Sequence, residues 1–341
     1  MSFLPVAFDR GRPATRMARM DTEAREAPVV GFAAAPDEGV VEALVREGIP
    51  VTVAETSLGG DRLAAFAASV PILVVRSSQR IDEPVFRAGS AGRLRAIVQA
   101  SAGLDNIDRT AARRYGVRVV PVDPGNAISV AELVIASLLA LFRNLPNRWA
   151  ETARGGWPDR ERLPDREVHG KVLGLVGLGR TGGRVATRAR ALGMRVLAVD
   201  PYVPGDRFVR LGVERVAALR EMLPRLDALS LHCPLTPETR GLIGAEELSL
   251  LPRGAVLVNA ARGAIVDEGA LRDALDRDHL RGAALDTWSE EPPPSGSLRD
   301  HPRVLPTPHA GGHTVESHAR RARHVLRALL ALARETGPGV P

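Results

Sequence analysis

The sequence has little of the chemistry that thiols and lysines provide. Cys233 is the only cysteine in 341 residues, which excludes an internal disulfide and a structural zinc site built from several thiolates. Of the 46 lysine and arginine residues only Lys171 is a lysine, and no Gly-Lys-Ser or Gly-Lys-Thr occurs. The chain therefore contains no P-loop.

Long hydrophobic runs are also absent. The longest, Ala131 to Phe142, contains Glu132 and Ser137, whereas a membrane-spanning helix needs about 20 apolar residues. The start, Met1 to Phe8, is too short for the apolar region of a secretory signal. The sequence therefore favours a cytoplasmic protein with no membrane partner.

The overall composition is that of a globular protein, with 45% hydrophobic and 25% charged residues. With 33 glycines and 26 prolines, a collagenous or low-complexity chain is excluded. At roughly 150 residues per domain, the length predicts about two domains.

Residues 1–27 carry several arginines with little apolar periodicity, and we expect a mobile basic tail there. Its element Arg10-Gly11-Arg12-Pro13 is of a kind that lies in the minor groove of DNA. The net charge of +6 is spread over the whole chain, however. We do not expect a nucleic-acid partner.

Short apolar runs alternate with helical stretches from residue 28 onward, which predicts parallel sheets covered by helices on both faces. The first expected strands are Pro28–Ala34, Val51–Glu55, Ile72–Arg76, Arg95–Ala100 and Val117–Val122, with helices at Asp37–Glu47 and Asp108–Tyr115. A long helix at Ile128–Arg143 leads to further strands at Val172–Val176, Arg195–Val199, Ala228–His232, Ala255–Asn259, Gly282–Leu285 and Val304–Pro306. Helices are expected near Thr181–Leu192, Ala245–Leu250, Glu268–Asp276 and Val315–Arg334. The fold class is thus α/β, with two doubly wound units.

A glycine-rich turn opens the second unit. Gly177, Gly179 and Gly182 form G-x-G-x-x-G directly after an apolar strand and at the start of a helix. They serve the tight turn, the approach of a pyrophosphate and close helix–strand packing, respectively. Asp200 ends the next strand, where a carboxylate holds a ribose 2′-hydroxyl and repels a 2′-phosphate. The pattern predicts NAD rather than NADP as cofactor, although nearby Arg207 and Arg210 work against that preference.

Three later strands each lead to a reactive side chain: Arg262, Glu291 and His309. Ligands of open parallel sheets bind beyond the carboxyl ends of the strands. Hydride transfer at a carbinol carbon needs a proton carrier such as imidazole. A carboxylate fixes the imidazole tautomer, and a guanidinium holds a carboxylate in a planar fork. These residues are therefore the predicted catalytic set.

Several motifs resemble the D-isomer-specific 2-hydroxyacid dehydrogenases. They are Gly170 to Gly179, Leu231-His-Cys-Pro-Leu-Thr-Pro-Glu-Thr239, Asn259-Ala-Ala-Arg-Gly-Ala-Ile-Val-Asp-Glu268, Leu285-Asp286-(x4)-Glu291-Pro292 and Thr307-Pro308-His309. They occur in family order across roughly residues 28–335. The resemblance implies a flavodoxin-like substrate domain, 28–123 plus 312–341, with a Rossmann NAD-binding domain, 124–311, inserted into it.

The resemblance also implies roles for individual residues. Arg262 binds substrate, His309 is the acid/base and Glu291 is its partner. Ala102 and Gly103 receive the substrate carboxylate through their N–H groups, and the cofactor site further includes Arg180, Thr181, Cys233, Ala260, Ala261, Asp286, Gly311 and Gly312. A homodimer is expected, with the helix at Ile128–Arg143 as its interface.

Two branches of this family fit the substrate side. Arg76, in Val74-Val-Arg-Ser-Ser-Gln-Arg80, resembles the phosphate-binding arginine of 3-phosphoglycerate dehydrogenases. Against that branch, Ser101-Ala102-Gly103 departs from its usual loop, and the 341 residues leave no room for a regulatory domain. A hydroxypyruvate or glyoxylate reductase is therefore the other candidate.

Two further interpretations concern the function as a whole and the histidines near the C-terminus. The same fold serves NAD-sensing corepressors, so a binding protein that takes NAD as a ligand is the alternative function. His309, His313 and His318 are close enough in sequence to raise the question of a metal site. Two glycines interrupt them, and hydride transfer to NAD needs no metal, so none is expected. His313 stands where the family pattern has a small residue.

Overall fold

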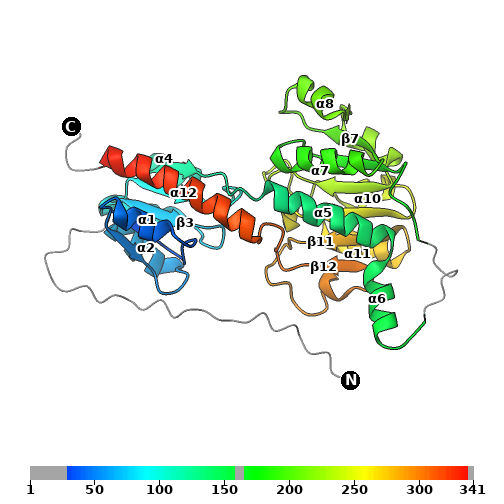
Figure 1. The fold of residues 1–341 in the computed structure, drawn as a ribbon, viewed down its shortest axis with the longest axis horizontal. Coiled ribbons are helices and arrows are strands. Elements are labelled where there is room, and N and C mark those ends of the chain that lie inside the picture. The colour runs from blue at the N-terminus through cyan, green and yellow to red at the C-terminus, as the bar shows by residue number, and fades with distance from the viewer. Residues whose placement is uncertain (1–28, 158–164, 337–341) are drawn as a thin grey trace.

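The computed structural model describes residues 29–157 and 165–336, which form two α/β units (Figure 1). Each unit is built around one sheet, and every strand pair in both sheets is parallel. The predicted fold class is confirmed. The predicted basic tail, 1–27, lies outside the described residues.

The first sheet has the strand order β2-β1-β3-β4-β5, which is the flavodoxin-like order. Its strands are β1 (Val30–Phe32), β2 (Val51–Val53), β3 (Ile72–Val75), β4 (Ala96–Gln99) and β5 (Arg118–Pro121). Its helices are α1 (Val40–Arg46), α2 (Gly60–Ser69), α3 (Glu83–Ala91) and α4 (Arg109–Arg114). Helices α2 and α3 are not among the predicted elements; in α3, the interior Gly89 weakens the helical pattern.

The second sheet has the order β12-β11-β10-β9-β6-β7-β8. Counted from β6, this is the Rossmann order with one strand added. The strands are β6 (Val172–Val176), β7 (Arg195–Val199), β8 (Glu214–Arg215), β9 (Ala228–Leu231), β10 (Ala255–Asn259), β11 (Leu280–Leu285) and β12 (Val304–Pro306). The edge strand β8 is not predicted, because both of its residues are charged and exposed.

The remaining helices connect or cover these strands. They are α5 (Ala127–Phe142), α6 (Leu145–Ala153), α7 (Arg180–Ala191), α8 (Gly205–Leu211), α9 (Leu219–Met222), α10 (Ala245–Leu250), α11 (Glu268–Asp276) and α12 (Val315–Thr336), with short 3₁₀ turns at Leu223–Arg225, Gly263–Ile265 and Leu298–Asp300. Helices α6, α8 and α9 are likewise not predicted.

Both faces of the second sheet are buried, which explains its continuous apolar strands. Along β10, Val256 and Val258 belong to the cluster under α5 and α7, whereas Leu257 belongs to the cluster on the opposite face. Helix α5 packs on β10, β11 and α7. The long apolar helix is therefore a core element of the second unit.

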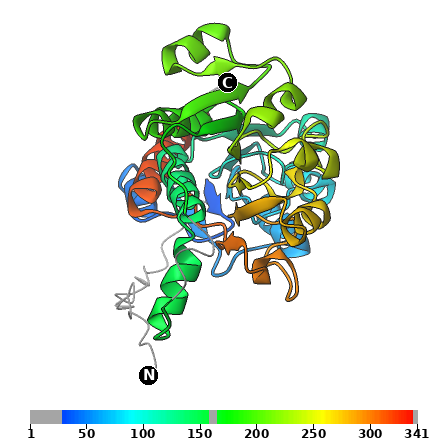
Figure 2. The same cartoon turned by 90° about the vertical axis from the view of Figure 1, so that its right-hand side faces the viewer.

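Helix α6 projects from the second unit (Figure 2) and has no buried residue. Its Leu145 and Trp149 are exposed, as is Trp157 beyond its end. Within the described ranges no single helix is long and apolar enough to cross a membrane. The pair α5 and α6 passes that test by length and composition only when taken together, across a 67° bend.

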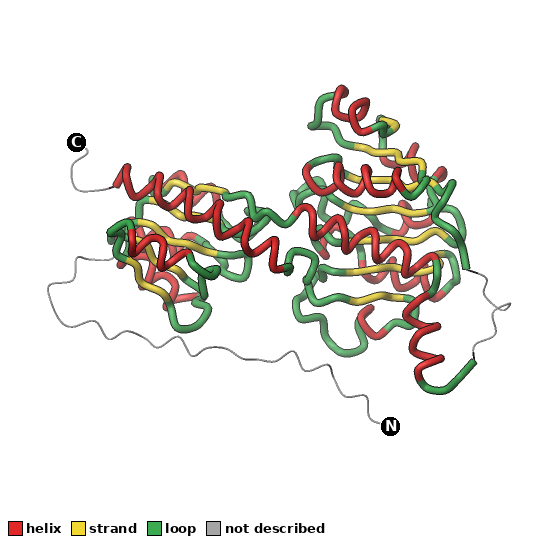
Figure 3. The backbone as a smooth tube through the Cα atoms, in the orientation of Figure 1, coloured by secondary structure: helices red, strands yellow, loops and turns green. Residues whose placement is uncertain are grey.

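The chain crosses between the sheets twice, and the two connections touch (Figure 3). A Cβ built at Gly312 would lie 2.9 Å from the Asn126 amide nitrogen. The hydroxyls of Ser129 and Thr314 are 2.8 Å apart. The second sheet is thus joined to the first through one narrow region.

Helix α12 returns to the first unit and packs on α1 and β4. Leu329 is fully buried there, with Val325 and Leu332 beside it. Next to the first crossover, His324 Nδ1 lies 2.8 Å from the Asp123 carbonyl oxygen, and Arg320 donates to the Gly125 carbonyl at 2.7 Å. The second sheet is therefore an insertion between β5 and α12. The exact boundaries at 123/124 and 311/312 stay a prediction.

The contact between Gly125 and α12 is testable. Gly125 has φ +67°, and a Cβ there would lie 2.5 Å from Arg320 Cβ. Gly125→Ala is expected to lower the free energy of unfolding by about 2–4 kcal/mol, because it combines a left-handed backbone with overpacking. Urea unfolding measures the loss.

Gly116 provides the matched control. It has φ +64°, but a Cβ there would meet no atom within 4 Å. Gly116→Ala should therefore lower the free energy of unfolding only by the cost of a left-handed backbone, about 1–2 kcal/mol. Equal losses in the two variants would contradict close packing at the crossover.

Candidate active site

The glycine turn connects β6 to α7. Gly177 has φ +96°, and a Cβ there would lie 2.9 Å from the His232 carbonyl carbon. A Cβ at Gly182 would collide with the Gly177 carbonyl oxygen, whereas one at Gly179 would meet nothing within 4 Å. The fold itself thus requires glycine at 177 and 182. At Gly179, the N-cap of α7, the open space adjoins the free N–H groups of a helix N-terminus.

Two charged side chains hold this turn. Asp200, directly after β7, accepts the Leu178 N–H with one oxygen at 2.8 Å and the Tyr202 N–H with the other at 2.9 Å. Arg207 on α8 donates to the carbonyls of Leu178 (2.5 Å) and Gly179 (2.7 Å). Sequence reasoning treated Arg207 only as a neighbour of the ribose site. The structure shows that it binds the backbone of the turn.

Arg180 and Thr181 begin α7 beside the turn. Arg180 makes a 2.5 Å ion pair with Asp123 at the first crossover, and its side chain stays 60% exposed. Burial raises the pKa of Asp123, but the Gly125 N–H, Arg180 and His324 outweigh it and hold that pKa below the usual value. Arg180, a predicted cofactor-site residue, is therefore linked to the connection between the two units.

His309 and Glu291 are in direct contact beyond β12 and β11. The imidazole Nδ1 lies 2.8 Å and 3.0 Å from the two carboxylate oxygens. The Trp288 N–H also donates to Glu291, at 3.2 Å. His309 has φ +54°, a left-handed conformation that costs a non-glycine residue about 1–2 kcal/mol. Because Nδ1 faces Glu291, Nε2 is the nitrogen left for a substrate.

Asp286 holds the loop that carries His309. It is 4% exposed and accepts from the Thr307 hydroxyl (2.7 Å), the Ala310 N–H (2.7 Å) and the Gly311 N–H (2.9 Å). A Cβ at Gly311 would lie 2.8 Å from the carboxylate. Asp286, which the family resemblance places in the cofactor site, thus already accepts three hydrogen bonds from its own protein, and a carboxylate has about four acceptor positions.

Arg262, beyond β10, reaches across to the first unit. It donates to the Ala102 carbonyl at 2.6 Å and to the Asp105 carboxylate at 3.2 Å. A Cβ at Gly103 would collide with its guanidinium. The structure therefore brings together Arg262, Ala102 and Gly103, as the sequence analysis expects. The contact with Asp105 is one that sequence reasoning missed, although Asp105 stands next to the quoted loop.

The Arg262 loop is fixed by Asn259 and Gly263. Asn259 is 1% exposed; it donates to the Arg262 carbonyl at 2.9 Å and accepts the Ala261 N–H at 3.1 Å, which shapes the turn through Ala260 and Ala261. A Cβ at Gly263 would overlap the backbone of Trp288. The loops of Arg262 and Glu291 are thus packed on each other.

Arg76 ends up half-buried rather than free at the surface. Its guanidinium lies 3.3 Å from Asp37, which also binds Arg321 of α12. Burial lowers the pKa of Arg76, and the positive charge of Arg321 adds to the effect. Nothing in the sequence pattern indicated Arg321.

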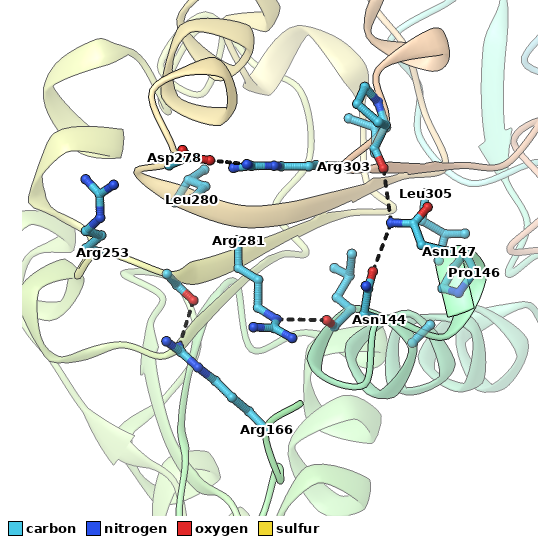
Figure 4. Close-up of a pocket in the computed structure, with 15 residues that line it drawn as sticks. Asn144, Pro146, Asn147, Arg166, Arg253, Asp278, Leu280, Arg281, Arg303 and Leu305 are labelled. Carbon is cyan, nitrogen blue, oxygen red and sulfur yellow. Dashed lines mark hydrogen bonds and ion pairs between the residues drawn. The ribbon is translucent and has the colours of Figure 1, made fainter. Parts of the chain in front are cut away.

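A cavity of about 710 Å³ lies elsewhere, at the amino ends of β10, β11 and β12 (Figure 4). Arg166, Arg253, Arg281 and Arg303 line it, together with Asp278. Arg262, Glu291 and His309 follow the carboxyl ends of the same strands. This cavity is therefore separate from the candidate active site. Within the described residues no group of three or more His, Cys, Asp or Glu side chains is placed to hold a metal ion.

Fold and site together define a two-domain dinucleotide-binding protein whose reactive side chains follow three neighbouring strands. A family profile described as "D-isomer specific 2-hydroxyacid dehydrogenase, NAD binding domain" matches residues 135–311, just over half of the chain. A Thermus thermophilus protein of known structure is 35% identical, with a TM-score of 0.81, and the match covers 92% of this chain and 99% of that one. The chain belongs to the family of D-isomer-specific 2-hydroxyacid dehydrogenases.

Named relatives fall in several branches. The D-3-phosphoglycerate dehydrogenase of Methanocaldococcus jannaschii is 40% identical over 84% of this chain and 55% of its own length. The enzyme of that name from Mycobacterium bovis is 41% identical over 82% and 52%. The D-lactate dehydrogenase of Aquifex aeolicus, solved with NAD and lactic acid, is 26% identical with a TM-score of 0.81, over 90% of this chain and 96% of that one. The chain spans about half the length of the curated relatives it matches.

The single cysteine gives a direct test of the packing behind the glycine turn. Burial raises the pKa of Cys233 to about 11, and the nearby Asp200 charge adds to this. At pH 8 the thiolate is then about 100-fold rarer than for an unperturbed thiol with a pKa of 9.0. We expect the native protein to react with a thiol reagent about 100-fold more slowly than the urea-unfolded chain. The native rate should still be rising between pH 9 and 11; equal rates at pH 8 would refute a buried thiol.

Proposed function

We propose that this protein is an NAD-dependent oxidoreductase that interconverts a D-2-hydroxy acid and its 2-oxo acid. One observation carries the proposal. The adjacent strands β10, β11 and β12 lead to Arg262, Glu291 and His309, and the first sheet carries the Ala102–Gly103 loop. Glu291 contacts His309, and Arg262 contacts that loop directly.

The residues around the glycine turn fit a dinucleotide. A Cβ at Gly179 would fill space that no protein atom occupies, and that space adjoins the N-terminus of α7, which favours phosphate. Asp200 follows β7 at the position of a ribose hydroxyl acceptor. When bound, NADH supplies the hydride that reduces C2 of the 2-oxo acid.

The chain's own residues move the proton and orient the substrate. In reduction, His309 donates a proton from Nε2 to the carbonyl oxygen, and Glu291 holds Nδ1 and stabilises the imidazolium before transfer. Arg262 and the Gly103 N–H bind the substrate carboxylate. Asp105 accepts from Nε and Nη2 of the guanidinium, and the carbonyls of Ala102 and Ala261 accept from Nη2 and Nη1, which fixes its plane. The substrate carboxylate would take the place of Asp105 on the Nε–Nη2 fork.

Arg76 supports a substrate that bears a second anionic group, of the 3-phosphoglycerate type. Its half-buried guanidinium is shared with Asp37, but Arg321 neutralises that carboxylate more closely. A hydroxypyruvate or glyoxylate substrate would leave Arg76 unused. No observation on the described residues favours the NAD-sensing alternative, and the basic tail, 1–27, lies outside them.

The activity is tested by NADH oxidation with hydroxypyruvate, glyoxylate, 3-phosphohydroxypyruvate, pyruvate and 2-oxoglutarate, with NADPH in parallel. His309→Gln should lower kcat by about 10²–10⁴-fold, because the proton donor is lost, while NADH affinity stays within about threefold. Arg262→Lys should lower kcat/KM although charge is kept, because the fork is lost. A comparable loss of NADH binding and turnover in His309→Gln would contradict the acid/base role.

A cytoplasmic homodimer completes the proposal. The buried face of α5, the interface expected from the sequence, packs into its own unit with seven of its 16 residues. The adjacent α6 instead exposes Leu145 and Trp149, 50% and 71% exposed, one helical turn apart. This apolar pair on a projecting helix is what an isologous contact would bury.

Trp149→Asp is therefore expected to shift the protein from dimer to monomer in light scattering after size exclusion. Tyr202, 88% exposed on the other side of the second unit, gives the matched control, and Tyr202→Asp should leave the dimer intact. A monomeric wild type, or a Trp149→Asp variant that stays dimeric, would disprove this interface.

A further inference from the structure

The cavity at the amino ends of β10, β11 and β12 is lined by arginines from four separate segments of the second unit (Figure 4). Arg166 precedes β6, Arg253 precedes β10, Arg281 lies in β11 and Arg303 precedes β12. Among the described residues that line the cavity, Asp278 alone is acidic, so the wall has a surplus of three positive charges. Its volume of about 710 Å³ falls within the range of small-molecule sites.

Arg281 forms the buried back of this wall. Its side chain is 9% exposed, and it donates to the Leu141 and Phe142 carbonyls at the end of α5, at 3.3 Å and 3.4 Å. Burial lowers the pKa of Arg281, and the charge of Arg166 adds to the effect, whereas Asp165 opposes it. Like charges therefore lie close together in the wall, and an anion beside them would reduce their repulsion.

The other three arginines have surface that an external ligand can reach. Arg253 is exposed, and its side chain makes no hydrogen bond or ion pair with another described residue. Arg303 is 39% exposed and pairs with Asp278 at the rim. Arg166 is half-buried and donates through Nη1 to the Gly254 carbonyl at 3.0 Å, which leaves most of its five N–H groups available.

The lining favours a ligand with phosphate groups. A guanidinium holds a phosphate through two parallel N–H bonds. Two phosphate groups carry about three to four negative charges near neutral pH, which matches the surplus charge of the wall. No aromatic residue of the described chain lines the cavity, so a nucleobase would find no ring on which to stack.

The cavity is far from the candidate active site. Strand β11 has six residues, which at 3.3 Å per residue is a length of about 20 Å. The cavity lies at the start of that strand, whereas Glu291 follows its end. A ligand in the cavity would therefore compete neither with the substrate nor with the cofactor.

We propose that this cavity binds a small molecule with two phosphate groups, held by Arg166, Arg253 and Arg303. Arg281 supplies positive charge from behind these residues. The Asp278 carboxylate weakens binding, because it neutralises Arg303 and repels the ligand. This site goes beyond the proposed oxidoreductase function and does not depend on it.

Pyrophosphate is the probe for the first experiment, because it consists of two phosphate groups and nothing else. Isothermal titration calorimetry on the full-length protein measures its affinity with and without NADH, and orthophosphate is titrated in parallel. We expect one site per chain, with pyrophosphate bound at least about tenfold more tightly than orthophosphate. NADH should change the pyrophosphate affinity by less than about twofold. Equal affinities for the two anions, or displacement of pyrophosphate by NADH, would overturn the proposal.

A matched pair of variants places the probe in the cavity. Arg253→Gln should lower the pyrophosphate affinity about tenfold, because a charged contact is lost. Arg87→Gln is the control, since Arg87 on α3 is also exposed and its side chain likewise has no partner among the described residues. Its affinity should stay within about twofold of the wild type. An unchanged affinity in Arg253→Gln, or an equal loss in Arg87→Gln, would refute the site.

Asp278→Asn tests the opposite sign. Asparagine tolerates the left-handed backbone of Asp278, at φ +56°, and the change removes the carboxylate that pairs with Arg303. Pyrophosphate should bind about threefold more tightly to this variant. An unchanged or weaker affinity would contradict binding at this wall. Turnover of a 2-oxo acid without pyrophosphate binding refutes the cavity site alone, and pyrophosphate binding as expected without turnover supports the site and counts against the oxidoreductase.

Discussion

The buried carboxylate of Asp286 is the interaction on which the rest of the site depends. A charge that is 4% exposed persists only if donors surround it, and here a hydroxyl and two backbone N–H groups do so. All three donors come from the loop after β12. That loop is thereby held in a shape that keeps His309 left-handed and next to Glu291, and the same loop starts the return of the chain to the first sheet. Asp286 therefore fixes both the position of His309 beside Glu291 and the start of the chain's return to the first sheet.

The site depends equally on contact between the two units. Arg262 follows β10 of the second sheet, yet two of its partners, Ala102 and Asp105, belong to the first unit. The Asp123–Arg180 pair links the crossover to α7, the helix that begins at the glycine turn. Movement of one sheet relative to the other would therefore change the surroundings of Arg262 and of α7 together.

The sequence predicts strands and turns that depend on neighbouring residues, and it misses contacts between residues far apart in the chain. Strands such as β6 and β10 are buried on both faces, so continuous apolar residues mark them, and Gly177 and Gly182 mark a turn that no other residue fits. The exposed two-residue β8 has no such signal. Asp105 and Arg321 act on partners 157 and 284 residues away in the chain. The spacing of these residues along the sequence does not indicate the contacts, because only the folded chain brings the partners together.

Reaction and selectivity are divided between different parts of this structure. The proposed acid/base pair and substrate arginine follow three strands of the second sheet, where the hydrogen bonds of Asp286 and Asn259 leave them little freedom. Arg76, which would contact the far end of a substrate, directly follows β3 in the first sheet and shares Asp37 with Arg321 of α12. A change at Arg76 leaves the Asp286 anchor and the Arg262 loop untouched. A fold of this kind can therefore change the acid it accepts while keeping the chemistry, because different elements carry the two tasks.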